Sequence, residues 1–189
     1  TWLRGQEQTA VLEWSADALL LSKGNNAAPI GRATIELVNP TKADDFATAV
    51  KTIASRVRGP VTLVLGEARV LRKVISLPLA ARDTLKQTVG YDLDRLTPFP
   101  SGTVLFDAVE KSVDHAARAV RAEFAATPRG PLDGLLSAAQ RAGLNIVRVV
   151  PATADIAGEL NLIRAQENAE KGSVWFSPHL WLGLLTAAL

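Results

Sequence analysis

A cluster of charged side chains near the middle of the chain is the first candidate for chemistry. The stretch YDLDRLTPFPSGTVLFDAVE, residues 91–110, contains Asp92, Asp94, Arg95 and Asp107. Two carboxylates share a proton or a metal ion only when their side chains converge, and Asp92 and Asp94, two positions apart on an expected helix, point to different sides. We interpret them as solvated positions compensated by Arg95 at the negative end of the helix, and Asp107 as an outward-facing strand residue. The functional alternative is that Asp92, Asp94 and Arg95 form a surface that binds a partner protein.

The other reactive side chains lack the partners that catalysis or metal binding requires. His115 and His179 have no second ligand at metal-binding spacing, and Ser101 and Ser137 are not in a Gly-x-Ser-x-Gly motif. Residues 63–70, LVLGEARV, contain a single glycine, which is too few for a phosphate-binding loop. The chain has no cysteine, so thiolate chemistry and disulfides are excluded. The sequence therefore predicts a protein that is not an enzyme and has no cofactor and no metal.

The composition is that of a globular protein with an almost balanced charge. Of 189 residues, 48% are hydrophobic and 21% are charged, which is enough apolar material for one core or two small lobes that share one. Lys and Arg together number 21 against 19 Asp and Glu, and no basic run is present. We therefore exclude nucleic acid as a partner.

Periodicity and turn residues predict alternating strands and helices. Ala81, Leu85, Val89, Leu93 and Leu96 form one apolar stripe, which predicts a single helix that begins after Pro78 and ends before Pro98. The other expected elements are a hairpin over 11–21, a loop over 25–32, a strand over 33–38, a helix capped by Thr41 and ended by Gly59, strands over 61–66 and 69–77, a hairpin over 103–126, a helix over 130–143 and a strand over 144–150. This order predicts an α/β fold in which the first strands share a sheet with the rest.

The C-terminal residues read as a tether and the start of a membrane anchor. Residues 155–173 are polar, and residues 174–189, VWFSPHLWLGLLTAAL, carry no formal charge. As a helix the last fifteen residues would span about 22 Å, against about 30 Å of hydrocarbon. We expect the truncated beginning of a transmembrane helix, with Trp175, Phe176 and Trp181 at the membrane interface. The alternative is an amphipathic helix that packs on the domain.

Residues 75–110 carry a family resemblance. They resemble the signature region of general secretion pathway protein L (GspL) and its PilN-domain relatives, in which Leu-Pro-Leu-Ala-Ala, Asp-Arg-x-Thr-Pro-Phe and Phe-Asp follow in this order. Matching positions are Leu77, Pro78, Leu79, Ala80, Ala81, Leu93, Asp94, Arg95, Thr97, Pro98, Phe99, Val104, Phe106 and Asp107. Residues 128–150 match as well, and ELNLIRAQ, residues 159–166, is similar to the family's Leu-Asn-Leu element next to the membrane. The resemblance covers residues 61–189.

The resemblance implies a reduced actin-like (RNase H-related) cytoplasmic domain of a single-pass, bitopic inner-membrane protein. Such a protein belongs to the assembly platform of a type II secretion or type IV pilus-like system. It implies a non-enzymatic scaffold that binds the N-terminal domain of the secretion or pilus ATPase and a second bitopic platform protein, GspM- or PilO-like. On this basis we divide the chain into an N-terminal lobe (1–60), a PilN/GspL-like lobe (61–154), a juxtamembrane tether (155–173) and the start of the transmembrane helix (174–189).

Two other interpretations remain. The first is an actin-like nucleotide-binding switch or ATPase, because family members that bind ATP carry Asp-x-Gly in their first hairpin. Here residues 12–21 have Glu13 and Asp17 with no glycine between them, an arrangement that repels phosphate and blocks close approach of the backbone. The second is a homodimer formed through the C-terminal helix.

Overall fold

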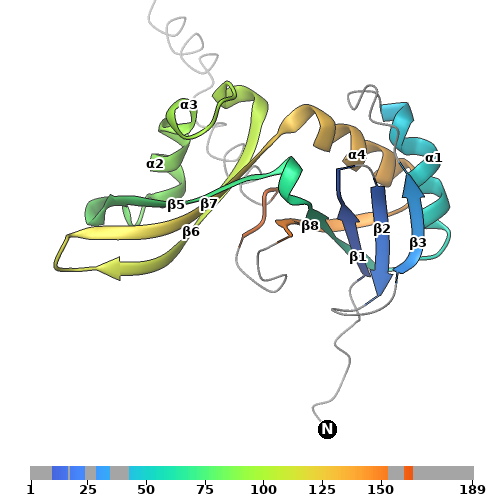
Figure 1. Ribbon diagram of the computed structural model, residues 1–189, viewed down its shortest axis with the longest axis horizontal. Helices are drawn as coiled ribbons and strands as arrows, with labels where there is room; N and C mark the ends of the chain where they lie inside the picture. The colour runs from blue at the N-terminus through green and yellow to red at the C-terminus, as the bar shows by residue number, and fades with distance from the viewer. Residues whose placement is uncertain (1–9, 17, 24–28, 35–42, 153–159, 164–189) are drawn as a thin grey trace, which may run out of the picture.

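A computed structural model describes the fold for residues 10–16, 18–23, 29–34, 43–152 and 160–163 (Figure 1). In chain order the elements are β1 (Ala10–Trp14), β2 (Ala18–Lys23), β3 (Pro29–Thr34), α1 (Ala43–Ala54), β4 (Pro60–Leu65), η1 (Glu67–Arg69), β5 (Leu71–Pro78), η2 (Leu79–Ala81), α2 (Leu85–Tyr91), α3 (Leu93–Leu96), η3 (Ser101–Thr103), β6 (Val104–Asp114), β7 (Ala119–Pro128), α4 (Arg129–Arg141) and β8 (Asn145–Pro151). The predicted cap Thr41 and the predicted membrane segment 174–189 lie outside the described residues.

A five-stranded mixed sheet is the first of two sheets, and its strand order is β3-β2-β1-β4-β8. β1, β2 and β3 form an antiparallel meander, while β4 and β8 extend the other side of β1 in parallel. Parallel neighbours need a crossover connection, and α1 lies in the connection between β3 and β4. The sheet confirms the predicted mixed α/β class, and it shows that the first strands share a sheet with β4 and β8.

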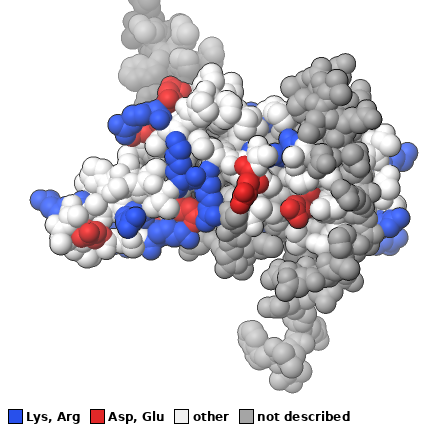
Figure 2. Space-filling view, viewed as in Figure 1, with Lys and Arg blue, Asp and Glu red and all other residues white. Residues whose placement is uncertain are grey.

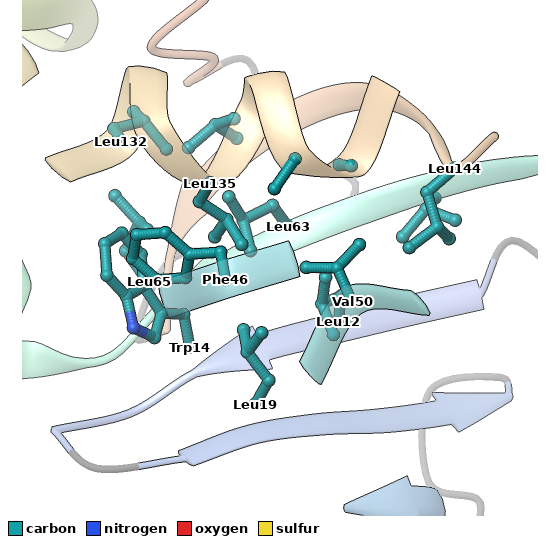
Figure 3. Close-up of a cluster of buried hydrophobic side chains, with 14 of the residues drawn as sticks. Leu12, Trp14, Leu19, Phe46, Val50, Leu63, Leu65, Leu132, Leu135 and Leu144 are labelled. Atoms are coloured by element: carbon teal, nitrogen blue, oxygen red, sulfur yellow. The ribbon is translucent and has the colours of Figure 1, made fainter. Parts of the chain in front are cut away.

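Helices α1 and α4 cover one face of this sheet and enclose the main core (Figures 1 and 3). The ring of Trp14 stands against Phe46 of α1 in an edge-to-face contact, with the ring centroids 5.3 Å apart. Such a contact adds about 0.5–1.5 kcal/mol to the effect of burial. Further buried members of this core are Leu12, Leu19, Val50, Leu63, Leu65, Leu132, Leu135 and Val149.

The second sheet has three antiparallel strands in the order β5-β7-β6. Helices α2 and α3 cover one face of it, and the predicted stripe is confirmed because Leu85, Val89 and Leu93 are buried there. The prediction of one continuous helix is wrong. At Asp92 the backbone takes φ −96° and ψ 6°, and its N–H bonds to the Val89 carbonyl three residues back, which tightens the turn and separates α2 from α3.

The two sheets are tied together by packing and by hydrogen bonds. Leu105 and Ala125 of the second sheet belong to the core of the first. The hydroxyl of Thr127 in β7 donates to a carbonyl of η1, which follows β4, at 2.8 Å. Within the first sheet, the N–H of Gly66, after β4, donates to the Trp14 carbonyl at the end of β1 at 2.9 Å. A Cβ at Gly66 would lie 3.1 Å from backbone atoms of residues 14 and 15, so this close approach favours glycine.

Two predicted boundaries differ from the structure. Residues 29–32, predicted as loop, begin β3, because the outermost strand of a sheet accepts a proline at its first residue. The first helix ends at Ala54 and not near Gly59, although Gly59 takes the positive φ (111°) that glycine permits. Within the described residues, no helix has the length and apolarity that a bilayer crossing requires.

Candidate functional site

The predicted partner-binding residues lie at the junction of α2 and α3. Arg95 donates to the carboxylate of Asp92 at 2.7 Å, which confirms that Arg95 compensates it. The carboxylate of Asp94 accepts a hydrogen bond from the N–H of Ser101 at 2.8 Å. The two carboxylates therefore serve different donors and do not share one site. Arg95 is 77% exposed and available to a partner, but its role in binding stays a prediction.

The turn after α3 forms one wall of an open pocket of about 360 Å³. Thr97 fixes the turn because its buried hydroxyl donates to the Phe99 carbonyl at 2.9 Å. Phe99 is left 38% exposed at the rim. The pocket, which we name the Trp14 pocket, is lined by Trp14, residues 68–71, Pro98, Phe99, residues 127–128 and Pro131.

Arg69 lies between the Trp14 pocket and the turn of the β1–β2 hairpin. Its Nε donates to the Ser15 carbonyl at 2.7 Å, and its Nη2 donates to the Ala16 carbonyl at 2.6 Å. The guanidinium carbon is 3.9 Å from the centre of the Trp14 ring, in cation–π geometry. Partial burial lowers the pKa of Arg69. The turn carbonyls of the first hairpin are thus engaged by an arginine of the same chain.

Asp107, predicted to face outward, is 1% exposed, so that prediction is wrong. Its Oδ1 is 2.6 Å from the ammonium of Lys86 in α2 and accepts the N–H of Ala108 at 2.9 Å. Its Oδ2 accepts the N–H of Asn161 at 2.9 Å. The carboxylate is buried because a segment 54 positions later in the chain bonds to it, and each oxygen has a donor.

That segment, residues 160–163, falls within the predicted polar tether, and the prediction is wrong for these four residues. Leu160 and Leu162 are 3% and 0% exposed, and apolar side chains of this size favour burial strongly. The N–H of Val149 in β8 donates to the Asn161 side chain at 3.1 Å, and the N–H of Leu162 donates to the Val149 carbonyl at 2.9 Å. The 160–163 segment therefore bonds to β8 of the first sheet and, through Asp107, to β6 of the second.

Sequence reasoning missed this site, although one signal was present. The pattern Leu-Asn-Leu interrupts a polar stretch with two large apolar residues, and it is the element that carried part of the family resemblance. The remaining residues of the predicted tether (155–173), and Trp175, Phe176 and Trp181, lie outside the described residues.

A second buried carboxylate lies in the three-stranded sheet. Glu123 of β7 is 2% exposed and pairs with Arg72 of β5 and with Lys111 of β6, the latter at 2.6 Å. Burial alone would raise the pKa of Glu123, but the hydrogen bonds and charges of Lys111 and Arg72 together lower it. Figure 2 shows basic side chains gathered over the half of the molecule that holds this sheet, with acidic ones among them.

The described residues contain no group of three or more His, Cys, Asp or Glu side chains that could hold a metal ion. His115 is exposed in the β6–β7 turn, and Ser137 is exposed on α4. The candidate site thus consists of ion pairs, a docked segment and an open pocket.

We compared the chain with protein families, curated proteins and solved structures, and only solved structures match. No family model matches the chain, and no curated protein does. Among solved structures, the cytoplasmic domain of EpsL, an inner-membrane component of the type II secretion system of Vibrio cholerae, matches with a TM-score of 0.54 at 15% identity, over 77% of this chain and 57% of that one. A chain of the PilM–PilN type IV pilus biogenesis complex matches with a TM-score of 0.58 at 23% identity, over 78% of this chain and 48% of that one.

The present chain spans about half the length of these two structures. The matches confirm the predicted resemblance to the GspL and PilN group at the level of the fold. Over the matched parts, the chain shares its fold with the EpsL cytoplasmic domain and with a chain of the PilM–PilN complex.

Proposed function

We propose that the chain is the cytoplasmic scaffold of a bitopic inner-membrane assembly-platform protein related to GspL and PilN. The observation that carries the proposal is the fold, which it shares with components of two machines, a type II secretion system and a type IV pilus. In this proposal the domain is not an enzyme. It couples the secretion or pilus ATPase to the platform, and residues 174–189 begin the single membrane anchor.

The docked 160–163 segment supports a mechanical role. A pull on the chain beyond residue 163 would act first on Asn161 and Leu162, which bond to β8 and to Asp107 of β6. Both sheets would then carry the load, because the segment contacts each of them. A scaffold that joins a cytoplasmic motor to a membrane assembly needs such a connection.

The ATPase would bind at the α2–α3 junction, where Tyr91 is 80% exposed and the Arg95 side chain is 77% exposed. Exposed aromatic and arginine side chains are enriched at protein interfaces. We further propose that the membrane-proximal part pairs with a GspM- or PilO-like protein. The proposal also includes the division of the chain into a lobe at 1–60, a lobe at 61–154, a tether at 155–173 and an anchor that begins at 174.

A pull-down with the N-terminal domain of the cognate ATPase tests the coupling role. The wild-type chain should bind at micromolar concentration, and Arg95→Glu should weaken binding at least about tenfold by reversing a contact charge. Arg121→Glu on β7 is the matched control, since Arg121 is exposed and lies outside the α2–α3 junction. Absence of wild-type binding at tens of micromolar contradicts the proposal, and equal loss in both variants contradicts the proposed contact.

A thermal-shift experiment with ATP and Mg²⁺ tests the nucleotide-binding alternative. A ligand at 100 times its Kd stabilises the folded state by about 2.7 kcal/mol, which raises Tm by several degrees for a chain of this size. We expect no rise, because Arg69 engages the turn carbonyls of the first hairpin. A dose-dependent rise would favour the actin-like switch.

A further inference from the structure

We propose that the Trp14 pocket binds a short extended segment of a partner protein in which an acidic residue lies next to an apolar one. The pocket would take the carboxylate at its inner end and the apolar side chain between its walls. The proposal does not depend on which machine the chain serves, and the pocket does not include the α2–α3 residues assigned to the ATPase.

The first donor group for a carboxylate is the N-terminus of α4. This helix has 13 residues and begins beside the pocket, whose lining includes Pro128 and Pro131. No side chain caps it, and the space around the Cα of Gly130 is open. Free N–H groups and the helix dipole give this end a partial positive charge.

A second and independent group of donors is formed by Arg69 and Trp14, which also line the pocket. The hydrogen-bond acceptors of Arg69 are two neutral carbonyls, and no described carboxylate forms an ion pair with it. The indole N–H of Trp14, a residue only 2% exposed, has no acceptor among the described groups. Among the described residues, a half-buried cation is thus matched only by neutral carbonyls and a buried donor has no acceptor, and both favour a ligand that brings carboxylate oxygens.

The walls of the pocket determine the rest of the ligand. Val70, Leu71, Pro98, Phe99 and Pro131 present apolar surface. The volume, about 360 Å³, is at the lower end of the range of ligand pockets, enough for one or two side chains. This combination fits a carboxylate followed by an apolar side chain.

A peptide fits better than a nucleotide. Among the described residues that line the pocket, Arg69 is the one cation, which matches a single carboxylate and not the charge of a triphosphate. The part of the lining that the structure describes also contains no glycine-rich phosphate loop and no lysine.

NMR on the ¹⁵N-labelled 189-residue chain tests the inference. The probe is the capped peptide acetyl-Phe-Asp-Leu-amide, and the readout is the indole N–H resonance of Trp14, assigned by its loss in Trp14→Phe. We expect a saturable shift, and at least about tenfold weaker binding of acetyl-Phe-Asn-Leu-amide, because only the carboxylate forms charge-assisted hydrogen bonds.

Variants separate the two halves of the site. Arg69→Gln should abolish the preference for the Asp peptide, and Phe99→Ser should weaken both peptides about tenfold while leaving the fold intact, since Phe99 is at the rim. Arg121→Gln, outside the pocket, should bind both peptides as wild type does. The inference is overturned if no saturable shift appears up to about 10 mM peptide, if the Asp and Asn peptides bind equally, or if Mg²⁺–ATP displaces the peptide from the pocket.

Discussion

The hydrogen bonds of Asn161 allow a quantitative test of the docked segment. Its side-chain oxygen accepts from the N–H of Val149 at 3.1 Å and, more weakly, from the N–H of Ile163 at 3.4 Å. Asn161→Ala removes this acceptor but keeps the backbone N–H that donates to Asp107. The variant therefore tests the side-chain attachment to β8 alone, because the bond from the Leu162 N–H to the Val149 carbonyl and the bond to Asp107 remain.

The expected cost follows from the burial of Val149, which is 0% exposed. A buried N–H left without an acceptor costs about 1–3 kcal/mol. We expect the free energy of unfolding to fall by about 2 kcal/mol, roughly a thirtyfold change in the folding equilibrium. Asn145→Ala, an exposed asparagine on the same strand, should change it by less than about 0.5 kcal/mol.

Two measurements check this expectation. Urea unfolding followed by circular dichroism gives the free energies, and native-state hydrogen exchange reports the protection of the Val149 amide. In Asn161→Ala that amide should exchange faster than in Asn145→Ala. Equal stabilities of the two variants, or unchanged protection of Val149, would refute the assignment of the Asn161 side chain as an attachment of the segment to β8.

Three further predictions concern the body of the domain. Leu93→Asp places a charge in the core under α3 and should cost about 3–5 kcal/mol in urea unfolding, whereas Asp92→Ala, which removes only an exposed ion pair, should cost less than about 1 kcal/mol. Gly66→Ala forces a Cβ to within 3.1 Å of the Trp14 carbonyl and should lower stability by about 1–3 kcal/mol, measured in the same way. Glu123 has a folded pKa below its ordinary value of 4.5, so its contribution to stability is present above that value and is lost as the pH falls through the folded pKa. Glu123→Gln should therefore reduce the acid-side loss of stability, and a pH series of urea unfolding that is the same in both proteins would contradict the ion-pair assignment.

Local sequence patterns were sufficient for most of the fold. The apolar stripe of Leu85, Val89 and Leu93 predicted the buried helix face, and the alternation over 103–126 predicted the β6–β7 hairpin. These signals are local, because each depends on residues a few positions apart. The break at Asp92 escaped the same reasoning, since an apolar stripe persists through a tightened turn.

The surroundings of Asp107 and Arg69 could not be predicted from local sequence patterns, because they depend on contacts between distant parts of the chain. The burial of Asp107 comes from Asn161, 54 positions away, and the partners of Arg69 are carbonyls 54 and 53 positions away. A lone aspartate on a strand and a lone arginine in a turn look like surface residues until the chain that covers them is known. The Leu-Asn-Leu pattern was recognised as a family element, but a polar neighbourhood gave no reason to place it against the domain.

The docked segment also has a consequence for where the chain can be shortened. A protein that ended at Pro151 would retain every described helix and strand, yet the outer side of β8 would lose the groups that bond to Val149. An outermost strand with unsatisfied backbone groups is a template for strand exchange and self-association. We therefore expect residues 160–163 to limit self-association of the domain in addition to joining its two sheets.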